Sequence, residues 1–267
     1  MIRDITIGQY YPAKSVVHRL DPRVKLASTM LFLISLFLTD RVSGYIFSGL
    51  CLLAVIHISR IPFKFIVKGL KAVFVLLFIS VSFNLFLTPG EALFKAGFLQ
   101  ITREGIRTAV FMAVRLVYLI IGSSLMTLTT TPNELTDGLE KSLGFLNRIH
   151  VPVHEIAMMM SIALRFIPIL IEETDKIMKA QMARGADFDT GGLMDRARAM
   201  VPLLVPLFIS AFRRAADLAQ AMEARCYHGG EGRTKLNPLK YERRDFAAYL
   251  LVGLYFLVMI GTRFLSI

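Results

Sequence analysis

The chain has 267 residues, of which 55% are hydrophobic and only 19% are charged. This composition excludes an ordinary soluble domain and indicates a membrane protein. The net charge of +11 could indicate nucleic acid binding, but the basic residues are spread over several segments and form no recognisable nucleic-acid module. We therefore assign the positive charge to membrane topology and to contact with anionic lipids.

Five sustained apolar runs predict membrane-spanning helices. Each is near the roughly 17 to 25 residues that a helix needs to cross a bilayer. Two further runs, 156–171 and 200–212, are interrupted by proline or arginine, so the sequence favours five spans and allows seven. The predicted fold class is all-α, a multi-pass helical membrane protein with about five transmembrane helices and long cytoplasmic helices. The five runs are 24–39, 42–58, 72–88, 109–129 and 246–265.

The basic residues predict how these spans are oriented. With five spans, most of the 31 lysines and arginines fall in segments on one side of the membrane. The positive-inside tendency makes that side the cytoplasm, so the N-terminus and the large segment before the last span are predicted to be cytoplasmic. The predicted domains are 1–130 with the first four spans, 131–243 with the cytoplasmic helices, and 244–267 with the last span.

Arg115 lies inside the fourth predicted span. A charge within the bilayer is costly and is usually paired or turned toward a polar cavity. No acidic residue lies one helical turn from it, so its partner must come from another helix. We interpret Arg115 as a structural intramembrane charge that anchors this span to the cytoplasmic helices, rather than as part of a transport path.

The segment 131–243 contains clear helix signals. Thr131, Pro132 and Glu134 form a capping-box pattern with proline at the first helical position, which predicts a short helix. A second helix can begin at Pro152 and run to Arg184, and a third can span 193–225. Both long helices contain a proline, Pro168 or Pro206, at which we expect a kink.

The two long helices end in the same pattern, A-x-x-A-R-[GC]. Each arginine is expected in the last helical turn, where the helix dipole favours a cation. A guanidinium offers forked donors to carboxylates but no titratable proton, so two such tips suit docking to two similar partners better than catalysis. Because cysteine tolerates a left-handed cap poorly, we expect the second helix to end differently from the first. The two copies end in Ala183, Arg184 and Gly185, and in Ala224, Arg225 and Cys226.

Met158, Met159 and Met160 form an unusual run near the start of the second long helix. Adaptable core packing is the ordinary explanation for such a run. Methionine surfaces can also accept several different partners, because the thioether side chain repacks at low cost.

The sequence offers no catalytic or metal site. It contains no Gly-Lys dipeptide, so the phosphate-binding loop of ATPases is absent and a partner must hydrolyse any ATP. His150 and His154 are separated by a proline and lack the order of a zinc-binding helix. Glu172 and Glu173 could indicate an intramembrane protease, but none of the predicted spans has an interior histidine. We expect these glutamates to pair along their own helix with Lys176 and Lys179.

With these features in place, the chain resembles the transmembrane T component of energy-coupling factor transporters, vitamin-uptake relatives of ABC importers. Each similar segment is a weak signal alone, and their order and spacing make the resemblance specific. The similar segments are the two arginine motifs at Arg184 and Arg225, with residues 18–25, 131–135, 164–168 and 229–234.

The resemblance implies a non-enzymatic scaffold in the cell membrane of a prokaryote. Its expected partners are two cytoplasmic P-loop ATPases, as a heterodimer carrying ATP and Mg²⁺, and a small membrane subunit that binds the vitamin. The chain itself is expected to bind no cofactor or metal. The two motifs would dock the ATPases, and Met158, Met159 and Met160 would face the substrate-binding subunit. A self-sufficient secondary transporter, a membrane anchor without transport and an intramembrane protease remain as alternatives.

Overall fold

Contacts divide the chain into two compact units. The computed structural model describes residues 10–89, 92–96, 99–186, 188, 192–230, 236 and 238–264. One unit, called here the membrane unit, comprises residues 10–141 and 239–264, and the other, called the long-helix unit, comprises 142–238. The domain limits predicted from the sequence concern sides of the membrane and stay a prediction.

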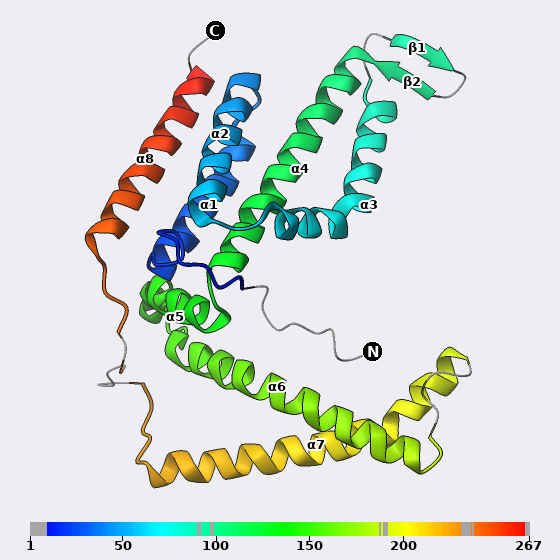
Figure 1. Ribbon diagram of the computed structural model, residues 1–267, viewed down its shortest axis with the longest axis vertical. Helices are drawn as coiled ribbons and strands as arrows, with labels where there is room; N and C mark the ends of the chain where they lie inside the picture. The colour runs from blue at the N-terminus through cyan, green and yellow to red at the C-terminus, as the bar shows by residue number, and fades with distance from the viewer. Residues whose placement is uncertain are drawn as a thin grey trace. The chain divides into compact units, whose positions relative to one another are not determined.

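The membrane unit is built around one long helix, α4 (Arg103–Thr129). It packs against α1 (Pro22–Leu38), α2 (Val42–Ser59) and α3 (Phe63–Leu87), and α8 (Arg243–Phe264) packs against α1 and α2 (Figure 1). A small antiparallel ribbon of β1 (Ala92–Ala96) and β2 (Leu99–Thr102), which the sequence did not predict, joins α3 to α4. The predicted class, an all-α multi-pass membrane protein, is confirmed.

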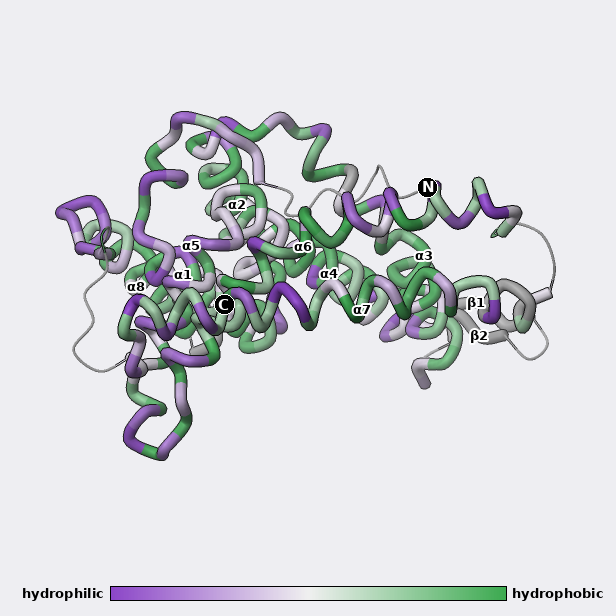
Figure 2. The backbone as a smooth tube through the Cα atoms, turned by 90° about the horizontal axis from the view of Figure 1, so that it is seen from below, coloured by the Kyte–Doolittle hydropathy of each residue, from purple (hydrophilic) through white to green (hydrophobic). Residues whose placement is uncertain are grey.

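Helices long and apolar enough to cross a membrane number five in the described part of the chain, or six with α3. These helices are not the five that the sequence predicted. Helices α6 and α7 are long and apolar enough to cross a membrane, whereas α1, with only 17 residues, is too short to be counted. In α3, the part Phe63–Lys71 diverges by 60° from Val73–Leu87. Figure 2 shows hydrophobic residues along α3 and α4 and more hydrophilic ones near α5.

Local signals explain where these helices begin. Asp21 caps α1 by accepting a hydrogen bond from the backbone N–H of Arg23 at 2.9 Å, with Pro22 at the first helical position. The capping box predicted for α5 (Pro132–Ser142) is confirmed. Glu134 accepts from the Thr131 N–H at 3.1 Å, and Thr131 Oγ1 accepts from the Glu134 N–H at 3.3 Å.

The hydrophobic core of the membrane unit lies where α2, the start of α3 and α4 meet. Its members are β-branched or leucine side chains, which fill the space between crossing helices without polar atoms. Small residues let the helices approach, since a Cβ on Gly122 would meet the ring of Phe32 at 2.8 Å. The buried cluster is Leu52, Ile61, Ile66, Ile121, Leu125 and Leu128.

The long-helix unit contains a short 3₁₀ turn, η2 (Gly144–Ile149), followed by α6 (Val153–Ala183) and α7 (Leu193–Ala224). The two long helices are antiparallel, since Glu173 contacts Arg214 and Gln181 contacts the carbonyl of Pro202. Both continue through their prolines as single helices, and the kinks expected at Pro168 and Pro206 stay a prediction.

Candidate docking site at the helix ends

The first arginine motif closes α6 with a complete C-terminal cap. Arg184 follows the last helical residue, and Gly185 adopts a left-handed conformation with φ 90°. The Gly185 N–H donates to the carbonyl of Met182, and the Ala186 N–H donates to that of Gln181, both at 3.0 Å. This pair of bonds is the Schellman motif, which satisfies carbonyls that the helix leaves free. The arginine is therefore held on a fixed backbone just past the last turn.

The second arginine motif closes α7 in the same way. Cys226 has φ 55°, and its N–H donates to the carbonyl of Glu223 at 2.9 Å. The N–H of Tyr227 donates to the carbonyl of Met222 at 3.1 Å. The expectation that cysteine would change this helix end is wrong, because the two hydrogen bonds hold the left-handed turn despite the Cβ. Arg184 and Arg225 thus occupy equivalent positions in two equivalent caps.

Both tips are open to solvent. The exposed residues include the alanine, the arginine and the residue after it in each copy: Ala183, Arg184 and Gly185, and Ala224, Arg225 and Cys226. An arginine beside the free carbonyls of a helix end is favoured by the dipole, and its fork of donors remains available to a partner's carboxylates. The arrangement can bind acidic surfaces.

Replacing Cys226 by glycine is expected to stabilise the long-helix unit. A left-handed conformation costs an L-residue about 1 kcal/mol, which glycine does not lose. We expect the unfolding temperature of the purified chain to rise by a few degrees, measured by circular dichroism. Cys226→Ala removes the thiol and keeps the Cβ, so it should leave the unfolding temperature unchanged. An equal rise in both variants would mean that the thiol, not the backbone, is the source of the effect.

An ion pair fastens α6 to α7 between the two tips. Glu173 accepts a hydrogen bond from Arg214 Nη2 at 2.6 Å and another from the hydroxyl of Ser210. The expected pairing of Glu173 along its own helix is wrong, because the antiparallel packing brings Arg214 and Ser210 of α7 within hydrogen-bonding distance. A carboxylate held by two partners on the neighbouring helix is a structural link between the two helices.

The methionine run lies in the first third of α6. Met159 and Met160 expose 57% and 41% of their surface, and Met158 is half-buried. Packing within the described chain therefore does not cover these side chains. They remain a candidate contact surface for another apolar protein.

Arg115 is anchored inside the membrane unit. Its Nε donates to the Tyr45 hydroxyl at 2.8 Å, and its Nη2 donates to the Thr39 carbonyl and the Asp40 carboxylate, both at 3.2 Å. The predicted partner on another element is confirmed, but the expected link to the long helices α6 and α7 is wrong. Arg115 instead fastens α4 to α2 and to the turn between α1 and α2.

A buried polar knot in the membrane unit was not predicted. Lys25, only 6% exposed, donates from Nζ to the carbonyls of His18 at 2.9 Å and Thr129 at 2.8 Å. Because Thr129 ends α4, the ammonium satisfies a free carbonyl at the negative end of that helix. Asp245, 1% exposed, accepts from the Asp21 N–H at 2.9 Å and the Glu242 N–H at 2.8 Å. We call Asp21, Lys25 and Asp245 the polar knot.

The segment before α1 closes this knot. The Tyr11 N–H donates to the Leu128 carbonyl at 2.9 Å, and His18 Nε2 lies 3.0 Å from the Tyr11 carbonyl. A carbonyl only accepts, so Nε2 carries the proton and Nδ1 accepts from the Ser15 hydroxyl at 2.7 Å. Burial lowers the pKa of His18 below its ordinary value, which agrees with this neutral form. Residues 18–25, one basis of the family resemblance, therefore tie the chain's start to α4.

Asp21 is held in its charged form. Burial raises the pKa of the carboxyl, but the hydrogen bonds and charge of Arg23 outweigh it and keep this pKa below its ordinary value. Arg23 also lies over the ring of Tyr241, 3.8 Å from its centre. The charged pair thus links the start of α1 to the approach to α8.

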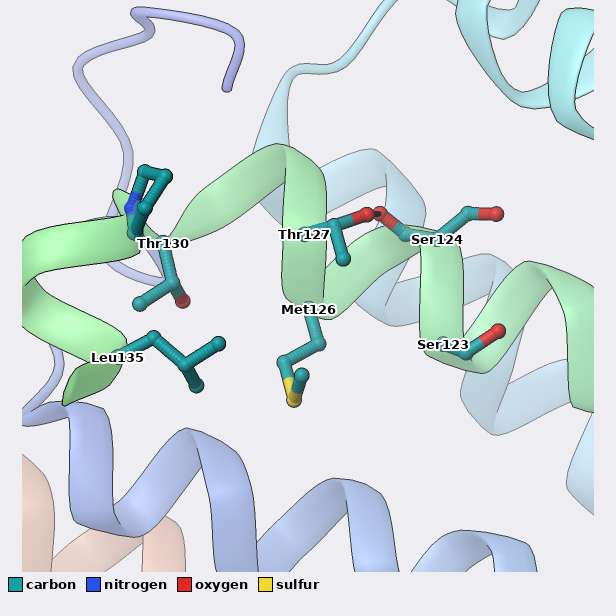
Figure 3. Close-up of a pocket in the computed structure, with 7 residues that line it drawn as sticks. Ser123, Ser124, Met126, Thr127, Thr130 and Leu135 are labelled. Atoms are coloured by element: carbon teal, nitrogen blue, oxygen red, sulfur yellow. Dashed lines mark hydrogen bonds between the residues drawn. The ribbon is translucent and has the colours of Figure 1, made fainter. Parts of the chain in front are cut away.

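A shallow groove runs along the junction of α4 and α5 (Figure 3). The Ser123 and Thr127 hydroxyls donate to backbone carbonyls of α4, at 3.1 and 2.9 Å. None of its lining residues titrates near neutral pH, so the groove offers surface for contact and no site for catalysis. It is lined by Ser123, Ser124, Met126, Thr127, Thr130, Pro132 and Leu135.

Known proteins are similar to this chain in sequence over nearly its whole length. A family model described as "CbiQ: Cobalt transport protein" matches residues 13–236. The chain belongs to this CbiQ/EcfT family. A relative from Clostridium kluyveri is 56% identical over 252 residues, covering 94% of this chain and 93% of the relative. One from Bacillus subtilis is 50% identical over 246 residues, covering 92% and 93%. Both are named energy-coupling factor transporter transmembrane protein EcfT.

The EcfT resemblance predicted from sequence is therefore confirmed, and the chain is a membrane component of an energy-coupling factor transporter. A relative from Thermosediminibacter oceani carries the same name and is 52% identical over 264 residues, or 99% of this chain and all of the relative. All three relatives are named as transmembrane proteins of a transporter, which agrees with a non-catalytic role and not with an intramembrane protease.

Proposed function

We propose that this EcfT-family chain couples two cytoplasmic P-loop ATPases to a small membrane subunit that binds a vitamin. The ATPases would carry ATP and Mg²⁺, and this chain would hold no cofactor. Closure of the ATPases would move the two arginine tips and, through α6 and α7, the membrane subunit. The chain would lie in a prokaryotic cell membrane with its N-terminus and long helices in the cytoplasm.

One observation carries the proposal: two exposed arginines stand on equivalent caps at the ends of two helices joined by an ion pair. A matched pair of rigid cationic tips fits two similar acidic pockets, as two related ATPases would present. The link between Glu173 and Arg214 would make the two helices respond together. Cys226 in place of the first copy's Gly185 fits two ATPases that are not identical.

The experiment is a gentle purification of the tagged chain from its native membranes, followed by mass spectrometry of the proteins that accompany it. We expect two P-loop ATPases and at least one small membrane protein. A chain that purifies alone would contradict the coupling role and return attention to a self-sufficient transporter.

The exposed methionines give the proposal a second test. We expect Met158→Leu, Met159→Leu and Met160→Leu together to weaken binding of substrate-binding subunits unequally, because leucine keeps the apolar surface and loses the thioether's freedom to repack. Co-purification of each subunit with the triple variant would measure this. Unchanged binding of every subunit would show that the methionines are ordinary packing residues.

A further inference from the structure

The corner between α2 and α3 forms an open groove with two basic residues. Arg60, just past the end of α2, takes the left-handed conformation with φ 56° and ψ 29°, and its N–H donates to the His57 carbonyl at 3.2 Å. For an arginine this conformation is uncommon and costs free energy, and such positions gather at functional sites. The groove is lined by Leu53, Ile56, His57, Arg60, Ile61 and Pro62.

The two basic side chains lack a counter-ion. Within the part of the chain that the structure describes, neither the Arg60 guanidinium nor the His57 ring has a hydrogen bond or an ion pair. The dipole of α2 favours positive charge at its C-terminal end, which explains why basic residues are placed there. It does not provide hydrogen-bond acceptors for their N–H groups. The remaining lining residues are apolar. The groove therefore suits a ligand that has an anionic group and an apolar part in the same molecule.

The surroundings place the corner where a membrane surface would be. α2 is long and apolar enough to span a bilayer, and it ends at Ser59. The next helical part, Phe63–Lys71, diverges by 60° from the rest of α3 and exposes Phe63 and Phe65. A helical segment that bends away from the rest of its helix and exposes aromatic residues and lysines is typical of the lipid headgroup layer.

An exposed apolar stripe runs from the groove along α2. Ile46, Leu50 and Leu53 are all exposed and follow one another at helical spacing on one face. Leu53 belongs to both the stripe and the groove. The stripe offers a path for an acyl chain that continues from the groove along α2.

We propose that His57 and Arg60 bind the headgroup phosphate of an anionic membrane lipid, with an acyl chain along the stripe on α2. Guanidinium binds phosphate through two parallel hydrogen bonds, and the imidazole adds a further donor. A soluble phosphate would leave the apolar walls and the stripe unused, so a lipid fits better.

The test uses the full-length chain in detergent with equal amounts of dioleoyl phosphatidylglycerol and dioleoyl phosphatidylcholine. Native mass spectrometry gives the ratio of the two lipids bound. Arg60→Asn suits the left-handed turn and removes the cation, so the preference for phosphatidylglycerol should fall about fivefold. Arg60→Lys keeps the charge and should stay within about twofold of the parent.

Arg19→Asn, at an exposed arginine before α1, is the matched control and should leave the preference unchanged. An equal fall in Arg19→Asn would show a general charge effect and overturn the site. An unchanged preference in Arg60→Asn would also overturn it. Displacement of phosphatidylglycerol by excess inorganic phosphate would mean that the corner binds a phosphate ion and not a lipid.

Discussion

Replacing Arg184 and Arg225 together by glutamate is expected to detach the ATPases while the chain stays inserted in the membrane. Each change puts a carboxylate at the position where the partner's acidic pocket binds the arginine guanidinium. Losing one side of a desolvated charge pair commonly costs about 2 to 5 kcal/mol, and repulsion adds to that. Two such losses sum to about 4 to 10 kcal/mol, which is comparable with the roughly 8 kcal/mol that holds a micromolar complex together. ATPase recovered per chain after affinity purification is the measurement.

Matched reversals elsewhere on the same helices separate docking from net charge. Lys176 on α6 and Arg213 on α7 are exposed and lie away from the tips. Lys176→Glu with Arg213→Glu changes the net charge equally and should retain both ATPases. Each single tip reversal should lower ATPase recovery partly, since one tip remains. Full ATPase recovery with the double tip variant would place the docking site elsewhere.

The helix ends could be predicted because their signals are local. The capping box at Thr131, the start after Pro152 and the ends near Arg184 and Arg225 depend on residues within one or two turns. The error at Cys226 shows the limit of a propensity argument. Glycine is preferred at a left-handed cap, but the two backbone hydrogen bonds hold a cysteine in the same conformation.

The partners of buried and paired charges could not be predicted, because they depend on tertiary contacts. Arg115 could be expected to have a partner, but nothing in its neighbourhood indicates Tyr45 or Asp40. Glu173 has lysines one turn away and nevertheless pairs with Arg214 on α7. The polar knot joins residues near opposite ends of the sequence. In the sequence, the polar knot was indicated only by the family similarity of residues 18–25. That similarity does not say which residues this segment contacts.

Lys25→Met is expected to destabilise the membrane unit strongly. Methionine keeps the apolar stem but leaves the buried carbonyls of His18 and Thr129 without their donor. Each buried polar group without a partner costs about 1 to 3 kcal/mol, and relief from burying the ammonium offsets part of this. A net loss of about 2 to 4 kcal/mol should lower the unfolding temperature markedly.

The measurement is thermal unfolding of the purified chain in detergent, with Lys14→Met as the matched control at an exposed lysine of the same segment. The control should unfold at the parent temperature, because Lys14 makes no buried contact. Lys25→Arg should recover only part of the loss, since a planar guanidinium does not fit the space of an ammonium between two carbonyls. If Lys25→Met and Lys14→Met unfold alike, Lys25 does not hold the end of α4, and the polar knot must depend on Asp245 and Asp21 alone.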